Sequence, residues 1–416
     1  MNVLIIGSGG REHALAWKIK QSPLLGALHA IPGSAAIAEL AQCPPIGQDD
    51  FESIGAYCAA QKIDLVVVGP EVPLSKGIAD FLTAKGVKVF GPSQQGAMLE
   101  ASKQFAKEFM YRNLLPTAAF TALVSPAFAR EKVKENKKYP VVIKADGLAA
   151  GKGVRICASE AEALEAVSDF MEKRIHGYSG SKVILEEFLT GREASVMALV
   201  DGKDFLMLPV SRDHKRLSDH DLGPNTGGMG AIAPLQLAPR DLEIIHKDIL
   251  RKFVDGIKKE NINFRGIIYV GLMFTPDGPK VLEFNTRFGD PETQALMPVI
   301  KTDLLELLAA CADGRLDGKT LEVNPGVCVA VVLSAEGYPE NPQKGAEITG
   351  LGQVPAGVEV FHSGTARSGG KTLTAGGRVL AVTALAPALA EAREKAYAAA
   401  RKIQFEGIHY RKDIGL

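Results

Sequence analysis

Residues 281–294, VLEFNTRFGDPETQ, gather acids, an amide and an arginine on what begins as a β-strand. Alternate residues of a strand share a face, so Glu283, Asn285 and Arg287 are predicted to point the same way. A carboxylate and an amide oxygen at that spacing can bind a hard cation such as Mg²⁺, which completes its shell with water and phosphate oxygens. Arg287 could bind an anionic carboxylate or phosphate. These residues alone are equally consistent with a solvated strand face that carries an ion pair.

Residues 141–154, VVIKADGLAAGKGV, form a second polar constellation. A buried strand is predicted to deliver Lys144 into a loop that contains Gly147, Gly151 and Gly153. Glycine backbone can place N–H groups on phosphate oxygens, and the lysine supplies positive charge. The spacing differs from the G-x-x-x-x-G-K-[ST] Walker loop. The alternative is a plain surface turn, but a lysine that ends a buried apolar strand argues against it.

Residues 183–195, VILEEFLTGREAS, form a third. The predicted strand runs into Glu186 and Glu187, where extended backbone could meet the edge of an adenine ring. Glu193 follows after one short loop, within reach of a ribose. In isolation this pattern is weak, and structural ion pairing explains it more simply.

Two glycine-rich segments complete the set. Residues 7–13, GSGGREH, join a strand to a helix and suggest dinucleotide binding, but Glu12 stands where that fingerprint requires its third glycine. A helix N-terminus still binds phosphate well; the alternative is a tight turn without a ligand. Residues 223–230, GPNTGGMG, contain more glycine than simple packing needs and predict a loop around a small substrate.

The elements that would position these groups begin with residues 1 to about 100, where Val/Ile runs ending in glycine alternate with amphipathic helices. This pattern predicts a doubly wound parallel sheet. A second α/β region follows, and from about residue 325 several strands and one Ala-rich helix predict a small α+β cap. The chain is therefore expected to be α/β and α+β, with domains at 1–102, 103–320 (including a lid at about 118–190) and 325–416.

Within the middle region, turn signals predict a hairpin at Asp201-Gly202 and a strand pair joined at residues 276–278. A helix is predicted over 240–260. Residues 213–230 are predicted to form a polar loop.

Composition excludes several classes of function. The 416 residues include 48 Lys+Arg and 48 Asp+Glu, and this zero formal charge argues against bulk electrostatic binding to nucleic acid or an anionic membrane. No apolar run is long enough to span a bilayer. The five cysteines show no zinc-like spacing and are expected to be reduced packing residues. A cytoplasmic enzyme is the expectation.

Lys103, Lys144 with its glycine loop, LEEFL, and the pair Glu283 and Asn285 occur in the order and spacing of the ATP-grasp ligases. Within that superfamily the chain resembles the glycinamide ribonucleotide synthetases along essentially its whole length. The resemblance rests on the motifs GSGGREHALAWK, VVVGPEVPL, IKADGLAAGKGV, DHKR, GPNTGGMGA, EFNTRFGDPETQ and RKDIG.

The resemblance implies ATP-dependent ligation of glycine to 5-phosphoribosylamine through glycyl phosphate, a step of de novo purine biosynthesis. It implies ATP with Mg²⁺ or Mn²⁺ as cofactors, and Glu283 and Asn285 as metal ligands. The position of another superfamily glutamate is Gly271, which leaves the ligands of a second metal open. A monomer is expected, with no nucleic-acid or membrane partner and a transient contact with the upstream amidotransferase.

The resemblance also implies which residues contact each substrate. ATP would be held by Lys103, Lys144, Gly147, Gly151, Gly153, Glu186, Glu187, Leu189 and Glu193. The phosphoribosyl substrate and glycine would be held by Gly9, Gly10, Arg11, Glu71, Asp213, Asn225, Thr226, Gly227, Gly228, Met229 and Arg287. The catalytic candidates are Lys144, Arg287, Asp213 and Asp290, and the identity of any general base stays open.

Two other functions compete with this one. The first is a related purine-pathway ATP-grasp enzyme, such as the carboxylase that acts on aminoimidazole ribonucleotide, against which RFGDPETQ argues. The second is an NAD-dependent dehydrogenase built on the first 100 residues. The incomplete glycine fingerprint and the lack of a clear acidic residue at the end of the second strand argue against it.

Overall fold

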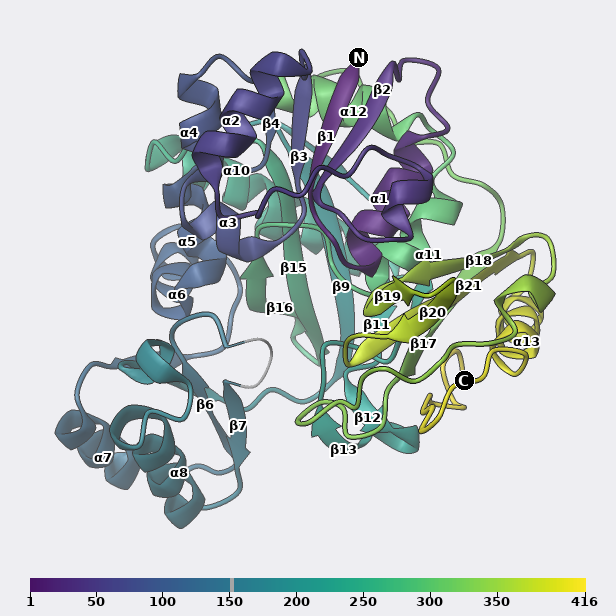
Figure 1. Cartoon of the computed structure of the whole chain (residues 1–416). Coiled ribbons are helices and arrows are strands. Elements are labelled where there is room, and N and C mark those ends of the chain that lie inside the picture. Colours follow the sequence, from purple (N-terminus) through teal and green to yellow (C-terminus); the bar gives the residue numbers. More distant parts are fainter. Residues whose placement is uncertain (150–152) are drawn as a thin grey trace.

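The computed structural model describes residues 1–149 and 153–416 (Figure 1). An N-terminal unit lies at the top of the view, a small unit at the lower left and a C-terminal sheet at the right, with the central strands between them. This mixed α/β and α+β arrangement confirms the predicted fold class. In the described ranges, no helix has the length and apolar character needed to cross a bilayer. All five cysteines are free, and four of them are buried.

The N-terminal unit is built on a parallel sheet of order β2-β1-β3-β4. Its strands are β1 (Asn2–Gly7), β2 (Ala27–Pro32), β3 (Leu65–Val68) and β4 (Val89–Phe90). The helices are α1 (Gly10–Ile19), α2 (Phe51–Ala60), α3 (Glu71–Ser75) and α4 (Ile78–Ala84). Continuous Val/Ile runs are typical of strands that are buried on both faces. The parallel sheet predicted for this region is confirmed.

The central antiparallel sheet has the order β10-β9-β15-β16. Its strands are β9 (Arg192–Val200), β10 (Phe205–Met207), β15 (Gly266–Thr275) and β16 (Gly278–Asn285). The associated helices are α5 (Gln94–Ala101), α6 (Lys103–Arg112), α9 (Pro239–Ile244), α10 (Lys252–Lys259), α11 (Glu292–Val299) and α12 (Leu304–Ala312). Both predicted strand pairs are confirmed. The helix expected over 240–260 is present, with a π-helical stretch at Ile245–Arg251.

The small unit at the lower left carries an antiparallel sheet of order β5-β8-β6-β7 (Figure 1). Its strands are β5 (Phe120–Leu123), β6 (Val141–Ala145), β7 (Val154–Cys157) and β8 (Val183–Glu187). The helices α7 (Pro126–Glu135) and α8 (Glu160–Val167) pack against each other. Ser159 caps α8 by accepting a hydrogen bond from the amide of Glu162.

The C-terminal sheet has the order β11-β14-β17-β21-β18 and is covered by α13 (Leu389–Ala400). Its strands are β11 (Arg212–Asp213), β14 (Gly230–Ala233), β17 (Val327–Ser334), β18 (Val358–His362) and β21 (Arg378–Ala386). Two hairpins complete the unit, formed by β12 (Arg216–Ser218) with β13 (Leu222–Asn225) and β19 (Thr365–Ser368) with β20 (Lys371–Thr374).

The predicted polar loop over 213–230 is wrong, because this stretch contains the β12–β13 hairpin and leads into β14. Its polar composition concealed the strands. Gly230 pairs so closely with β17 that a Cβ there would lie 2.7 Å from the carbonyl oxygen of Ala330. Arg411, near the end of the chain, holds the hairpin by donating to the carbonyl of Arg216 and the carboxylate of Asp221. The C-terminal sheet therefore includes two strands from the middle of the chain.

Candidate active site

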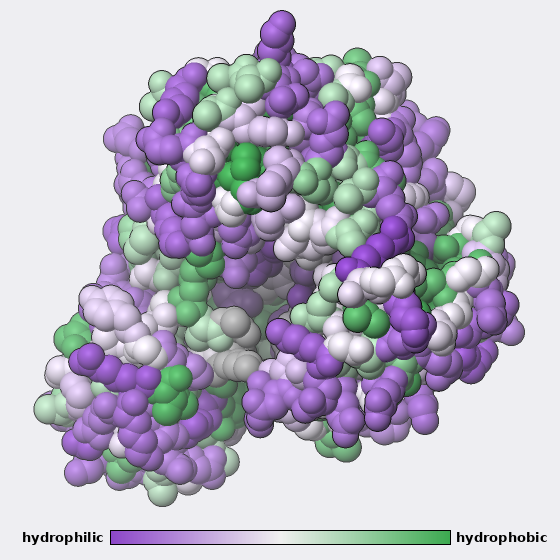
Figure 2. Space-filling model, viewed as in Figure 1, coloured by the Kyte–Doolittle hydropathy of each residue, from purple (hydrophilic) through white to green (hydrophobic). Residues whose placement is uncertain are grey.

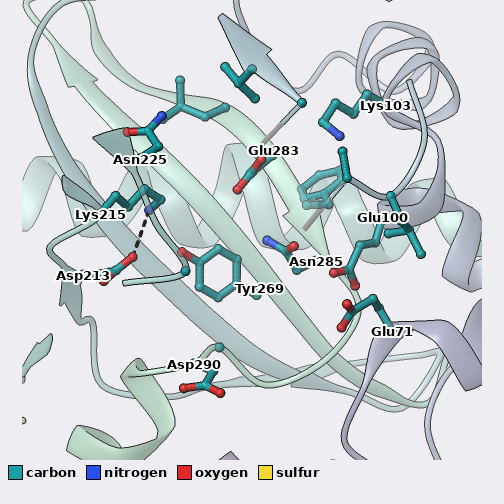
Figure 3. A pocket seen from close by; sticks show the side chains of 18 of the residues that line it. Glu71, Glu100, Lys103, Asp213, Lys215, Asn225, Tyr269, Glu283, Asn285 and Asp290 are labelled. Carbon is teal, nitrogen blue, oxygen red and sulfur yellow. Dashed lines mark ion pairs between the residues drawn. The ribbon is translucent and has the colours of Figure 1, made fainter. Parts of the chain in front are cut away.

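A cavity of about 620 Å³ opens where these units meet. The space-filling view shows the surface hollowed between the N-terminal unit, the small unit and the C-terminal unit (Figure 2). Acids, lysines and amides from all parts of the chain line it (Figure 3). The labelled side chains are Glu71, Glu100, Lys103, Asp213, Lys215, Asn225, Tyr269, Glu283, Asn285 and Asp290.

Strand β16 turns Glu283 and Asn285 toward this cavity (Figure 3). The residue between them, Phe284, is buried and packs edge-on against Phe109 and Phe253 on the other face. Apolar burial of one face thus fixes the direction of the polar face. Burial opposes ionisation of Glu283, but nearby lysines, Lys144 foremost, outweigh it and lower the pKa of this carboxyl. An ionised carboxylate and an amide oxygen therefore face the cavity together.

Arg287 lies just beyond β16 and is engaged by two carboxylates. Its Nη2 is 2.9 Å from Glu100 Oε1, and its Nε is 3.5 Å from Glu71 Oε2. Nη2 also donates to Asn285 Oδ1 at 3.3 Å, so Arg287 helps to orient the amide oxygen. Glu100 was missed by sequence reasoning, since its partner Arg287 lies far away in the sequence. The predicted anion-binding role of Arg287 stays a prediction.

Lys144 is the second-last residue of β6 and reaches across to β16. Its Nζ donates to the carbonyl of Leu282 at 3.2 Å and lies 2.9 Å from Glu186 Oε2. Lys107 approaches the same carboxylate oxygen at 3.3 Å, and burial lowers the pKa of Lys107 to about 8 even though Glu186 opposes the shift. Glu186 Oε1 is buried without a hydrogen-bond partner. That orphaned acceptor fits an amino group of a bound molecule.

Lys107 was not predicted, although a signal exists. It lies four residues after Lys103 on α6, and residues at that spacing share a helix face. Both lysines line the cavity. Lys103 Nζ also donates to the carbonyl of Gly147 at 3.4 Å, which ties α6 to the start of the glycine loop.

Of the remaining residues predicted to hold ATP, some line the cavity and others do not. Gly147 has no room for a side chain, because a Cβ would lie 2.6 Å from Ser179 Oγ, and Gly153 lines the cavity. Gly151 lies outside the described residues. Among the described residues that line the cavity, Glu187, Leu189 and Glu193 are absent. Glu193 is 45% exposed at the cavity edge, where Lys215 approaches it at 3.6 Å.

Asp213 and Lys215 lie near Tyr269, on the side of the cavity opposite Lys103 and Glu100 (Figure 3). Asp213 Oδ2 is 3.5 Å from Lys215 Nζ, whereas Oδ1 is buried and has no hydrogen-bond partner. Burial raises the pKa of Asp213 to about 7, and Lys215 offsets only part of that effect. Sequence reasoning missed Lys215, although strand alternation from Asp213 could have identified it. His214 between them is buried, and burial lowers its pKa to about 4, which supports a structural role.

Asp290 has a different environment from Asp213. Its Oδ1 accepts a hydrogen bond from Gln294 Nε2 at 2.8 Å, and Oδ2 lies 3.2 Å from Arg378 Nη2. Burial opposes ionisation, but Arg378 and Arg11 outweigh it and lower the pKa of Asp290. Both oxygens are therefore occupied by protein donors, so Asp213 is the better placed of the two to accept a proton.

The loop that follows β13 packs against this pair of acids. Asn225, Thr226 and Gly227 line the cavity, whereas Met229 is buried in the core. Gly228 has φ +112°, and a Cβ there would lie 2.4 Å from Pro291 Cδ and 2.5 Å from Asp213 Oδ1. Only glycine fits this position without moving its neighbours.

At the N-terminal end of the cavity, Glu12 occupies the space under the glycine turn. Its Oε2 accepts the amide of Gly9 at 2.7 Å, and its carboxyl fills the space that a Cβ on Gly7 or Gly69 would need. The third glycine of a dinucleotide fingerprint would leave this space free, and its occupation by Glu12 argues further against dinucleotide binding. Arg11 lines the cavity and pairs with Glu12 at 2.5 Å.

No three His, Cys, Asp or Glu side chains gather at metal-binding distance in the described part of the chain. A metal bound by Glu283 and Asn285 would have one carboxylate and one amide oxygen from the protein. That donor set suits a hard cation whose remaining ligands are water and phosphate oxygens.

Comparisons with known proteins agree with this geometry. Three models of phosphoribosylglycinamide synthetase match the chain, the N domain at residues 1–100, the ATP-grasp (A) domain at 101–293 and the C domain at 328–416. A phosphoribosylamine–glycine ligase from Caldanaerobacter subterraneus subsp. tengcongensis is 47% identical over 100% of this chain and 99% of its own length. The trifunctional purine biosynthetic protein adenosine-3 of Gallus gallus is 46% identical over 99% of this chain and 42% of its own length.

A solved structure leads to the same family. The crystal structure of phosphoribosylamine–glycine ligase from Thermotoga maritima aligns with a TM-score of 0.88 and 38% identity, over 100% of both chains. Matches of this extent separate the chain from the dehydrogenase and carboxylase alternatives that the sequence left open. The chain belongs to the phosphoribosylglycinamide synthetase family of ATP-grasp ligases.

Proposed function

We propose that this cavity ligates glycine to 5-phosphoribosylamine, with cleavage of ATP to ADP and phosphate. The observation that carries the proposal is the arrangement of Glu283 and Asn285 on β16 beneath Lys144 and Lys103, in a chain of this family. ATP-grasp ligases use ATP with a divalent cation, and Mg²⁺ or Mn²⁺ suits the two oxygen donors. Bound there, the cation would neutralise phosphate charge.

In the first step, a carboxylate oxygen of glycine attacks the γ-phosphorus of ATP. The bond between that phosphorus and the bridging oxygen breaks, so that ADP leaves and glycyl phosphate forms. Such phosphoryl transfers depend on positioning and charge stabilisation more than on covalent chemistry. Lys144 and Lys103 supply fixed positive charge beside Glu283, and the loop containing Gly147 and Gly153 would cover the phosphates.

In the second step, the amine nitrogen of phosphoribosylamine attacks the acyl carbon. The C–O bond to phosphate breaks and inorganic phosphate leaves. The nitrogen must lose a proton, and Asp213 Oδ1 is a buried acceptor with no partner in the protein. We assign Asp213 as that acceptor and Asp290, whose oxygens are both occupied, as a binding residue.

The remaining predicted residues would bind the adenosine part of ATP and the phosphoribosyl group. Glu186 Oε1 would accept a hydrogen bond from the adenine amino group, with Glu187, Leu189 and Glu193 near the base and ribose. Arg11 and the start of α1, at Gly9 and Gly10, would hold the phosphate of the phosphoribosyl group, and a helix N-terminus favours that charge. Glu71 and Arg287 would face its sugar. A monomeric state, a cytoplasmic location and a transient contact with the upstream amidotransferase stay predictions.

Measuring ADP release with each substrate omitted in turn tests the proposal. ADP should be released over many turnovers only when ATP, a divalent cation, glycine and phosphoribosylamine are all present. ADP release stimulated by bicarbonate in place of glycine would contradict it.

A further inference from the structure

The C-terminal unit contributes two polar side chains to the cavity wall that no step above uses. Tyr338 follows β17, and Arg378 is the first residue of β21. Both line the cavity, and the side chain of Arg378 is 21% exposed.

Arg378 joins two separate segments of the site. Its Nη1 donates to the carbonyl of Gly227 at 2.6 Å and to the carbonyl of Asp290 at 2.8 Å. Its Nη2 lies 3.2 Å from the Asp290 carboxylate. One planar guanidinium thus fixes the loop after β13 to the turn before α11. A lysine offers a single ammonium and cannot reproduce this fork of donors.

Tyr338 holds the same loop from the other side. Its hydroxyl accepts a hydrogen bond from the amide of Gly227 at 2.9 Å. Its ring packs so closely over Gly377 that a Cβ there would lie 2.2 Å from the ring. The amide and the carbonyl of Gly227 are therefore both bonded to the C-terminal unit.

The hydrogen bonds to Gly227 and Asp290 hold segments that contact Asp213, the residue assigned as proton acceptor. Gly228, next to Gly227, is wedged between Pro291 and Asp213 Oδ1, and Pro291 follows the Asp290 that Arg378 holds. A shift of the loop or the turn would change the surroundings of the Asp213 carboxylate. Lys144, Lys103 and Glu283, on the side of the cavity assigned to ATP, make none of these contacts.

We propose that Arg378 and Tyr338 are positioning residues that align the glycine and amine half of the site, so that the C-terminal unit controls acyl transfer without contacting ATP. This inference rests on the proposed function. A purely structural role predicts a different result, because loss of an interface contact alone would change the KM for all three substrates equally.

The test is steady-state kinetics in which ATP, glycine and phosphoribosylamine are each varied. For Arg378→Met, kcat/KM for glycine and for the amine should fall about 10- to 100-fold, as expected when charged hydrogen bonds are lost, with the KM for ATP within about twofold of wild type. Tyr338→Phe, which removes one neutral hydrogen bond, should show the same pattern at about 3- to 10-fold. Arg378→Lys should lie between wild type and Arg378→Met.

Arg393→Met is the matched control. Arg393 lies on α13 in the same unit and donates to the carbonyls of Ile414 and Lys412, outside the cavity. It should leave all three KM values unchanged. A wild-type kcat/KM for glycine and for the amine in Tyr338→Phe and Arg378→Lys, or an equal rise in KM for all three substrates, would overturn the inference. A wild-type protein without glycine-dependent ADP release would instead refute the proposed function.

Discussion

The Asp213→Asn substitution tests the proton acceptor. Asparagine has nearly the same shape and fits the same space beside Gly228, but it cannot take up a proton. The change therefore removes the titration of Asp213 while it preserves the packing around the buried Oδ1.

The size of the effect follows from the burial of this carboxyl. Burial raises the pKa of Asp213 from 3.8 to about 7. Below the lower value the carboxyl is protonated in both the folded and the unfolded chain. As the pH rises from there to about 7, the unfolded chain ionises first, so folding stability falls, and above about 7 the loss is complete. A shift of this size corresponds to about 4 kcal/mol.

Two assays detect this titration. Urea unfolding at pH 5 and pH 8 should show that the stability of the wild type relative to Asp213→Asn decreases by about 2–3 kcal/mol over this interval, which is the part of the titration that remains above pH 5. The wild-type kcat/KM for the amine should rise with pH up to about 7, and the variant should lack that rise. Substrate ionisation is common to both proteins and cancels. An Asp213→Asn profile with the same inflection near neutral pH would refute the assignment of Asp213.

Three further substitutions examine other parts of the site. Glu283→Gln should reduce kcat/KM for the metal–nucleotide by about 100-fold or more without unfolding the chain, because a charged ligand is lost; normal turnover at low Mg²⁺ would contradict the metal assignment. Arg11→Ala should raise the KM for phosphoribosylamine about tenfold or more and spare that for ATP; an unchanged value would remove Arg11 from the site. Gly228→Ala should destabilise the loop by about 2–4 kcal/mol and raise the KM for glycine, since its Cβ overlaps Pro291 and Asp213; wild-type kinetics would show that the loop is not held as described.

Much of the fold was predictable because its signals are local. Apolar runs ending in glycine marked the parallel strands, and turn residues marked both hairpins. The alternation along β16 predicted that Glu283 and Asn285 share a face, and the burial of Phe284 supplies the physical reason.

The parts that sequence reasoning missed depend on contacts between distant segments. Arg378 meets Gly227 and Asp290 across 151 and 88 residues, and no spacing rule connects them. Glu100 acquires its importance through contacts with Arg287 and Thr286, which lie far away in the sequence. From the sequence, Asp213 and Asp290 were equal candidates for a catalytic role. Their hydrogen-bond partners in the structure distinguish the free acceptor of Asp213 from the occupied oxygens of Asp290.

The most direct measurement is a crystal structure with a nonhydrolysable ATP analogue and Mn²⁺, with the anomalous signal used to locate the metal. The central claim predicts a peak within bonding distance of Glu283 and Asn285, next to the terminal phosphate, with Lys144 on the opposite side. A metal bound elsewhere, with those two side chains remote from the γ-phosphorus, would contradict it.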